Sequence, residues 1–243
     1  MIDIHCHIMF GVDDGSFSLS ESVEMARVAL EGGTDVIVAT PHANAPDLDP
    51  NDWDAEFDKK LKSLNDALVS EGIPLTVCPG HEVFCSDNVV RLYRGGKLMT
   101  LNRSRYLLIE FDFYSDVESM LAYCDDLSDQ GVIPVIAHPE RYEAIKEDLD
   151  AAFRLKRHGC LLQLNGGSLF GAFGRASREV AHDLIGEYAA DFIASDAHSP
   201  YMRTPYLADA HEMVCELYSP DYADLLFDEN PRRVLQNEET LVF

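Results

Sequence analysis

Two motifs place metal-binding side chains two residues apart. His5-x-His7 stands near the start of the chain and Asp196-x-His198 near its far end. Alternate residues of a strand point to the same side, so both side chains of each motif can reach one ion. Imidazole and carboxylate ligands, with no cysteine required, suit manganese, iron or zinc rather than a thiolate-bound structural zinc. The spacing therefore predicts metal chemistry.

Residues of the same types follow other apolar runs of the sequence. A lone histidine at such a place is more often a hydrogen-bonded structural residue than a ligand. Ligand types at the ends of six runs together favour a shared site. The full candidate set is His5, His7, Asp14, His42, Glu82, Glu110, His138, Asp196 and His198. These nine candidates are too many for one ion and indicate two or three.

Seven apolar runs rich in β-branched residues alternate with amphipathic stretches, which is typical of repeated βα units around a parallel sheet. The predicted strands span 2–8, 35–40, 75–79, 106–110, 132–137, 161–165 and 192–195. The predicted helices span 19–31, 53–69, 117–130, 147–158, 175–188 and 203–218. In a β/α barrel the carboxyl ends of the strands meet on one face. We therefore expect an α/β fold, a TIM-like (β/α)7 barrel in one domain over 1–243, with its metal site at those ends.

The overall charge excludes several partners. Nineteen basic and 43 acidic residues give a net charge of −24, which repels nucleic acid and anionic lipid surfaces. The N-terminus lacks a basic and apolar leader, and no apolar run approaches membrane-spanning length. Six cysteines occur without a Cys-x-x-Cys pair, as expected of free thiols in a reducing compartment. We expect a cytoplasmic protein with no nucleic-acid partner and no membrane insertion; an oligomer stays open.

The candidate site has the charge of an anion-binding pocket once it is filled with metal. Four carboxylates and five neutral imidazoles carry −4, and three divalent ions would add +6. Arg141 and Arg203 follow His138 and His198 closely, in loops that leave the same face. A guanidinium can bind two phosphate oxygens at once, although an ordinary surface ion pair is the alternative for each arginine. The combination predicts a metal-dependent phosphoester hydrolase.

Other residues of these types allow more than one interpretation. Asp14 lies in Asp13-Asp14-Gly15-Ser16, which also has the composition of a turn before a helix. His81 adjoins Glu82 but would point to the opposite side of a continuing strand. Three further histidines lie on predicted helices away from the strand ends, and we expect them to be surface or packing residues: His158, His182 and His211.

Taken together, these motifs resemble the polymerase and histidinol phosphatase (PHP) superfamily. Within it, they are similar to the bacterial manganese-dependent protein-tyrosine phosphatases of capsule and exopolysaccharide loci (the CpsB/YwqE type). The resemblance covers essentially the whole chain. Its motifs are Met-Ile-Asp-Ile-His-Cys-His at 1–7, Gly-Val-Asp-Asp-Gly at 11–15, Ala-Thr-Pro-His at 39–42, Ile-Glu-Phe at 109–111, Pro-Val-Ile-Ala-His-Pro-Glu-Arg-Tyr at 134–142, Ile-Ala-Ser-Asp-Ala-His at 193–198 and Glu-Asn-Pro-Arg-Arg-Val at 229–234.

The resemblance implies a PHP fold, a distorted barrel with a trinuclear centre of Mn2+, with iron or zinc as alternatives. It assigns His5, His7, Glu110 and Asp196 to one ion, Glu82, Glu110 and His138 to a second, and Asp14, His42 and His198 to a third. It thereby makes Asp14 a ligand and a catalytic residue. It also makes Arg141 and Arg203 phosphate-handling residues. His81 departs from the pattern, where Gln or Ala is expected.

The implied reaction is hydrolysis of phosphotyrosine by hydroxide bridging the metals. The implied substrate is the tyrosine-rich tail of a bacterial tyrosine kinase that regulates polysaccharide export. A small-molecule phosphatase, such as one acting on histidinol phosphate, and a regulator without turnover are the alternatives. Cys85 and Arg91 stand six positions apart, as in thiol phosphatases, but no glycine-rich anion loop follows Cys85 and Asp87 lies close to it. We therefore reject a thiolate mechanism.

Overall fold

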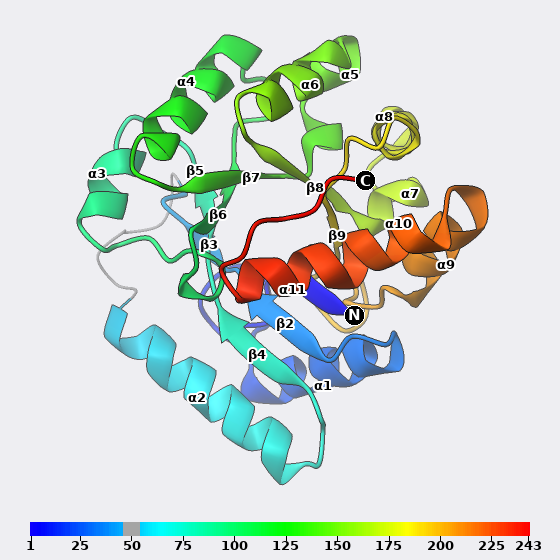
Figure 1. Ribbon diagram of the computed structural model, residues 1–243. Helices are drawn as coiled ribbons and strands as arrows, with labels where there is room; N and C mark the ends of the chain where they lie inside the picture. Colours follow the sequence, from blue (N-terminus) through cyan, green and yellow to red (C-terminus); the bar gives the residue numbers. More distant parts are fainter. Residues whose placement is uncertain (46–53) are drawn as a thin grey trace.

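The computed structural model describes residues 1–45 and 54–243, and its strands and helices alternate along the chain (Figure 1). The strands are β1 (Ile2–Cys6), β2 (Val36–Ala39), β3 (His42–Ala43), β4 (Thr76–Pro79), β5 (Glu82–Phe84), β6 (Tyr106–Glu110), β7 (Ile133–Ala137), β8 (Leu161–Asn165) and β9 (Phe192–Ala194). The α-helices are α1 (Leu19–Glu31), α2 (Asp54–Ser70), α3 (Val89–Arg94), α4 (Val117–Ser128), α5 (Glu143–Glu147), α6 (Asp150–Arg157), α7 (Gly166–Leu169), α8 (Arg175–Gly186), α9 (Ala208–Leu217), α10 (Pro220–Asp224) and α11 (Asn230–Leu235). Short helical turns η1 (Leu101–Arg103), η2 (Pro139–Arg141) and η3 (Leu225–Glu229) complete the described elements.

The strands form two parallel sheets that together make a distorted barrel. One sheet has the order β1-β2-β4 and the other β3-β5-β6-β7-β8-β9. Only two residues separate β2 from β3, and only two separate β4 from β5, so each pair occupies one barrel position. A parallel bridge between Cys6 and Ala197 links the first and last positions. The seven positions confirm the predicted (β/α)7 barrel.

The breaks between the two sheets have local causes. Pro41 lies between β2 and β3 and has no N–H to donate to a neighbouring strand. Gly80 lies between β4 and β5, where an added Cβ would stand 2.8 Å from the Val38 side chain. The chain can pass Val38 there only because residue 80 has no side chain. Each break is followed directly by a predicted ligand, His42 at the start of β3 and Glu82 at the start of β5.

The barrel interior is apolar towards the amino ends of the strands. Ile4, Val38, Leu108 and Phe192 are fully buried there and form one cluster with Val234 of α11. In Figure 1, α11 (red) crosses the near side of the barrel close to the start of β1 (blue), and it contacts β1 and η1. α11 therefore closes this end, which leaves the carboxyl ends of the strands as the open face.

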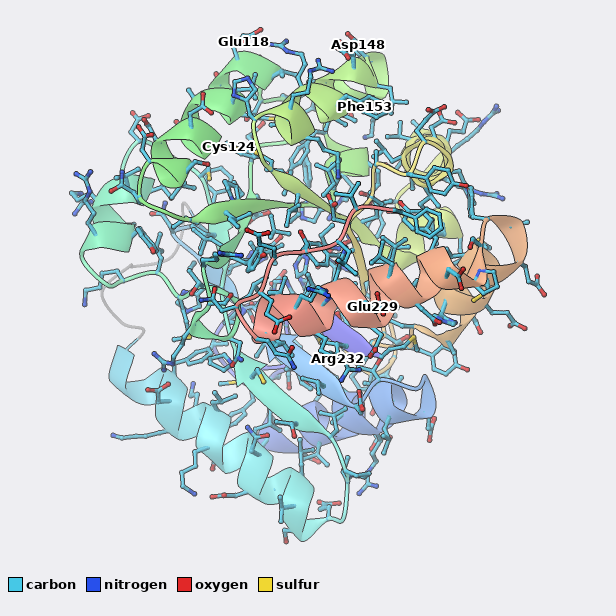
Figure 2. The ribbon with its side chains drawn as sticks, in the orientation of Figure 1. Glu118, Cys124, Asp148, Phe153, Glu229 and Arg232 are labelled. Atoms are coloured by element: carbon cyan, nitrogen blue, oxygen red, sulfur yellow. The ribbon has the colours of Figure 1, made fainter. Side chains whose placement is uncertain are left out.

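The outer helices bury one side each. On α4, Cys124 is buried in the main core cluster while Glu118 lies on the outer surface and binds Arg154 of α6 (Figure 2). Ser18 caps α1 by accepting a hydrogen bond from the Glu21 N–H. Within the described residues, no helix is long and apolar enough to cross a membrane.

Four predicted helices were too long: those at 117–130 and 175–188 end two residues earlier, at Ser128 and Gly186, and two others start later than predicted. The helix predicted for 147–158 starts only at Asp150, because Asp148 has extended backbone angles. The helix predicted for 203–218 starts at Ala208, because Arg203 has a φ of 49° and belongs to a loop. The apolar periodicity of a sequence does not indicate such local backbone conformations. Trp53, the first residue of the predicted second helix, lies outside the described residues.

Candidate metal centre

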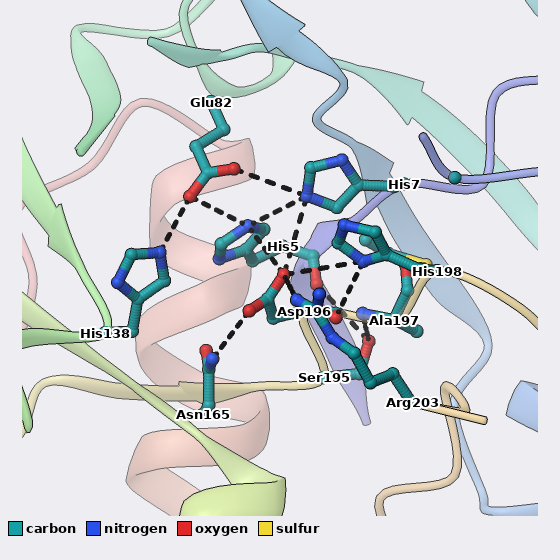
Figure 3. Close-up of polar contacts among 12 residues, drawn as sticks. His5, His7, Glu82, His138, Asn165, Ser195, Asp196, Ala197, His198 and Arg203 are labelled. Carbon is teal, nitrogen blue, oxygen red and sulfur yellow. Dashed lines mark hydrogen bonds and ion pairs between the residues drawn. The ribbon is translucent and has the colours of Figure 1, made fainter. Parts of the chain in front are cut away.

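The predicted ligands come together in one pocket at the open end of the barrel. The cavity has a volume of about 380 Å³. Seven of the nine candidates line it together with both arginines, so that the polar part of its wall is Asp14, His42, Glu82, Glu110, His138, Asp196, His198, Arg141 and Arg203. His5 and His7 are fully buried directly beneath, in contact with Glu82 and Asp196 (Figure 3).

His5 and His7 are held with their outer nitrogens facing each other. His5 Nδ1 lies 2.7 Å from Gln163 Oε1, and His7 Nδ1 lies 2.7 Å from Asp13 Oδ2. Because both partners are acceptors, each neutral ring carries its proton on Nδ1 and has a lone pair on Nε2. The two Nε2 atoms are 3.3 Å apart. Such an arrangement fits a cation between or beside the two lone pairs.

Glu82 lies at the centre of the cluster. Its Oε1 is 3.0 Å from His138 Nε2 and 3.3 Å from His5 Nε2. Its Oε2 is 3.3 Å from His7 Nε2 and 3.0 Å from His42 Nδ1. Glu110 Oε1 lies 3.2 Å from His42 Nδ1. Glu82 therefore contacts both members of His5-x-His7, as does Asp196, whose Oδ1 lies 3.5 Å from each Nε2.

Asp14 joins a second group of ligands nearer to solvent. Its Oδ1 is 3.5 Å from His42 Nε2 and 3.4 Å from His198 Nε2. His7, Asp14, His42 and His198 offer ligand atoms that all lie within 4.8 Å of one another. The neighbouring Asp13 makes the turn, because its Oδ1 accepts the Gly15 N–H. Asp13 thus makes the turn that the composition predicts, and Asp14 lies among the candidate ligands.

Several site residues have unusual backbone conformations. His138, Asp196 and Arg203 have φ values of 38°, 50° and 49°, which cost energy for residues other than glycine. The His138 and Asp196 N–H groups donate to the carbonyls of Gln163 and His5, both at 2.8 Å. The Arg203 carbonyl accepts from the His198 N–H at 2.9 Å. Neighbouring strand ends thus hold these residues in place.

The charges of the site call for cations. Burial alone would lower the pKa of His42, but hydrogen bonds to Glu110 and Glu82 raise it to about 10. Burial also lowers the pKa of His7, but the hydrogen bond to Asp13 and the charge of Asp13 outweigh burial. The pKa of His7 therefore rises well above its ordinary value. The pKa of Glu82 falls well below its ordinary value despite burial, because His5 and His138 lie against it. Negative charge concentrated on buried carboxylates favours bound cations, so the residues present fit a multi-metal centre.

Both predicted arginines reach the site through Asp196. Arg141 Nη1 lies 3.4 Å from Asp196 Oδ2, and Arg203 Nη2 lies 2.6 Å from Asp196 Oδ1. The Arg141 guanidinium also lies 4.6 Å from the Phe113 ring centre and 4.5 Å from that of Phe173. Cation–π contacts therefore hold Arg141 from both sides at the edge of the pocket. Neither arginine forms an ordinary surface ion pair.

Sequence reasoning missed the residues that orient the ligands. Gln163 and Asp13 hold His5 and His7, and Asn165 donates to Asp196 Oδ2 at 2.6 Å. Buried Asp3 accepts from the Ser195 backbone and hydroxyl beside Asp196. Gln163-x-Asn165 has the same alternate spacing as His5-x-His7 and ends a predicted strand. This spacing could have indicated from the sequence that Gln163 and Asn165 face the site.

The remaining histidines lie outside the candidate metal groups. His81 accepts the Met99 N–H at Nδ1, and its ring packs edge-on against Phe57. The other three lie on or just beyond helices, where they pair with neighbouring side chains: His158 with Asp125, His182 with Tyr218, and His211 with Asp224. They are surface and packing residues, as expected.

The cysteine most like a thiol nucleophile is unsuited to that role. Cys85 is buried, and burial raises the pKa of its thiol well above the ordinary range. A nucleophilic cysteine needs the opposite shift, because the thiolate is the reactive form. Arg91 lies in the last turn of α3. The structure thus supports rejecting a thiolate mechanism.

Comparisons with known proteins agree with this site. The family model described as capsular polysaccharide synthesis, CpsB/CapC, matches residues 1–236. Tyrosine-protein phosphatase YwqE of Bacillus subtilis (strain 168) is 35% identical over 238 residues, which cover 98% of this chain and 92% of that protein. Tyrosine-protein phosphatase CpsB of Streptococcus pneumoniae is 28% identical over 244 residues, covering 98% and 99%.

Solved structures extend the comparison to the fold. A crystal structure from work on YwqE and CpsB, described as metal-dependent tyrosine phosphatases, matches with a TM-score of 0.93 and 34% identity, covering 100% of this chain and 97% of that chain. Histidinol phosphate phosphatase from Lactococcus lactis matches with a TM-score of 0.59 at 12% identity, covering 93% and 94%, which is a likeness of fold alone. The chain belongs to the CpsB/CapC family of capsular polysaccharide synthesis.

Proposed function

We propose that this protein is a metal-dependent phosphatase that hydrolyses phosphotyrosine on a protein, with the whole chain forming one metallophosphatase domain. The observation that carries the proposal is the single pocket in which imidazoles, carboxylates and two guanidinium groups converge. That combination can hold several divalent ions and a phosphate against them. The family membership and the names of the relatives support the same activity.

We assign three metal positions, with manganese as the first choice and iron or zinc as alternatives. His5, His7, Glu82 and Asp196 would hold one ion, and Glu82, Glu110 and His138 a second; Asp14, His42 and His198 would hold a third. Glu82 replaces Glu110 at the first position because it contacts both His5 and His7. The bound metals would neutralise the phosphate and lower the pKa of a water towards neutrality.

The protein's own residues would bind and orient the substrate. Arg141 and Arg203 lie at the pocket edge, where their guanidinium groups can bind phosphate oxygens. Phe84, Phe111 and Phe113 also line the pocket and offer apolar surface to a phenyl ring. Asp14 is about two-thirds exposed and stands at the entrance, where it can take part in catalysis as well as in metal binding. The aromatic wall favours a phosphotyrosyl group over a small polar alcohol.

The proposed partner is the tyrosine-rich tail of a bacterial tyrosine kinase that regulates capsule or exopolysaccharide synthesis, and the proposed location is the cytoplasm. All six cysteines are free thiols. Such a set suits a reducing compartment.

One experiment separates the two enzyme hypotheses. Manganese-loaded protein is given a phosphotyrosyl peptide and histidinol phosphate side by side, and kcat/KM is measured for each. We expect the peptide to be preferred by about a hundredfold or more, because its apolar phenyl ring carries the phosphate directly and meets the aromatic wall, whereas the imidazole of histidinol phosphate is polar and several bonds away from its phosphate. Faster turnover of histidinol phosphate would favour the small-molecule alternative, and trapping of a phosphocysteine or phosphohistidine would refute the mechanism.

A further inference from the structure

Two further pockets adjoin the metal pocket, and residues of the loop at 112–116 line both of them. The first shares Phe84 and Asp112 with the metal pocket. The second shares Phe113 and Arg141 with it. A peptide whose phosphotyrosine enters the metal pocket can lay its neighbouring residues over these two pockets, because consecutive residues are only about 3.8 Å apart.

The first side pocket repels anions. Asp87, Asp112 and Asp116 line it, and its described lining contains no lysine or arginine. Asp116 is engaged as the N-cap of α4, and Asp87 accepts a hydrogen bond from Tyr123. Neither contact brings a cation into the pocket.

The second side pocket, which we call the Lys146 pocket, has the opposite character. It is lined by Phe113, Tyr114, Arg141, Glu143, Lys146, Phe173 and Ser177 and has a volume of about 240 Å³. That volume is below the usual range for a whole small-molecule ligand and suits one side chain. Two cations and one carboxylate leave it with a net positive charge.

The Lys146 pocket is built before any substrate arrives. The Glu143 N–H donates to the Phe113 carbonyl at 2.9 Å, which ties the two walls together. Lys146 is only 19% exposed, and its ammonium lies 2.9 Å from Glu143 Oε1. An ammonium has three N–H donors, so Lys146 can bind a second carboxylate beside Glu143. Arg141 is already fixed between Phe113 and Phe173.

We propose that the Lys146 pocket is a specificity subsite for an acidic side chain close to the phosphotyrosine. The inference rests on the proposed function. Because the opposite pocket is lined by aspartates, an acidic residue is favoured on one side of the phosphotyrosine only. The opposite charges of the two pockets thereby fix the direction in which a peptide crosses the site.

The test measures kcat/KM of the manganese-loaded protein on seven-residue peptides with phosphotyrosine in the middle. The parent peptide has alanine at all other positions, and each variant carries one glutamate at one of them. We expect glutamate on one side to raise kcat/KM about threefold to tenfold and glutamate on the other side to lower it, with both effects weakened by salt. Equal rates for all peptides would overturn the subsite, while turnover of the parent peptide would still support the phosphatase.

Charge-changing variants test whether the preference for glutamate arises at Lys146. Lys146→Glu should reverse the preference, so that lysine replaces glutamate as the favoured residue at the same peptide position. The matched control is Lys62→Glu on α2, which changes the net charge equally at a lysine that is 74% exposed and outside the described lining of all three pockets. Glu143→Gln should strengthen the glutamate preference by removing the competing carboxylate. Identical peptide preferences in the Lys146 and Lys62 variants would contradict the proposal, as would an unchanged preference in Glu143→Gln.

Discussion

The two ends of the barrel differ in what the same strands provide. At the closed end, apolar side chains pack against Val234 of α11, and Tyr106 donates its hydroxyl to the Glu238 carbonyl. At the open end, the strands finish in imidazoles and carboxylates, and His138 and Asp196 have positive φ values. Stability and chemistry are therefore separated along the strand axis. The free energy gained by burying apolar side chains at the closed end can offset the cost of strained and charged residues at the open end.

The largest effect should follow from neutralising the centre of the open end. Glu82→Gln removes the charge that contacts His5, His7, His42 and His138, and we expect kcat/KM to fall by about a thousandfold or more, with loss of bound metal. The fold should remain, because replacing this buried carboxylate leaves the closed end intact. Activity and metal content per chain measure the change.

Glu110→Gln is the matched control for that experiment. Glu110 has the same side chain but lies against His42, with His138 at 3.9 Å, and it is partly exposed. We expect a smaller loss than in Glu82→Gln. A larger loss in Glu110→Gln would restore Glu110 to the shared position at the first metal.

A change at the closed end should lower stability and spare activity. Phe192→Ala truncates a fully buried ring at the start of β9. The free energy of unfolding should fall by about 3–5 kcal/mol, because a cavity replaces the ring. Urea unfolding measures this loss, and kcat/KM of the folded variant should stay within about threefold. A loss of activity as great as that in Glu82→Gln would show that the two ends are not separable.

Asp13→Ala tests how a ligand at the open end is oriented by its hydrogen-bond partner. Without Asp13, His7 loses the acceptor that fixes its proton on Nδ1. We expect metal affinity or activity to fall by about 10- to 100-fold, as is typical when a ligand's orienting partner is removed. Asp35→Ala, a largely exposed carboxylate near the amino terminus, is the control and should leave both unchanged. Equal behaviour of the two variants would remove the orienting role of Asp13.

The smallest effect concerns pH dependence at the closed end. Burial raises the pKa of Asp191, although Lys156 and the Leu162 N–H oppose the shift. The folded state therefore keeps a proton that the unfolded state releases near pH 4. Stability from this group is complete below that pH and is lost as the pH rises through the raised folded pKa. The difference in unfolding free energy between the protein and Asp191→Asn should shrink over that window in urea titrations; a constant difference would contradict this account.

Most of the barrel could be predicted from the sequence, because apolar periodicity and turn residues are local signals. The seven strand positions and the convergence of the ligand types follow from them. The predicted helix at 203–218 was wrong at its start, where Arg203 has a positive φ and its carbonyl accepts from the His198 N–H. Contacts between distant segments, such as His5 with Gln163, leave no periodic signal in one sequence.

The first strand shows the same limit most clearly. Simple alternation places His5 and Ile4 on opposite sides, yet Ile4 packs inside the barrel and His5 contacts Gln163 there. The register between β1 and β2 shifts between Asp3 and Cys6. Such an irregularity can re-aim a side chain towards a site. The His5-x-His7 spacing pointed to the metal site, but the shift that delivers His5 to it was not predictable.

The most direct test of the central claim is a manganese titration of metal-stripped protein. Bound metal per chain and turnover of a phosphotyrosyl peptide are measured together, for the natural sequence and for the double variant His5→Ala, His7→Ala. We predict no turnover in the stripped protein, recovery to a plateau at about three ions per chain, and fewer ions with no recovery in the variant. Full activity in the stripped protein, or in the double variant, would contradict the account.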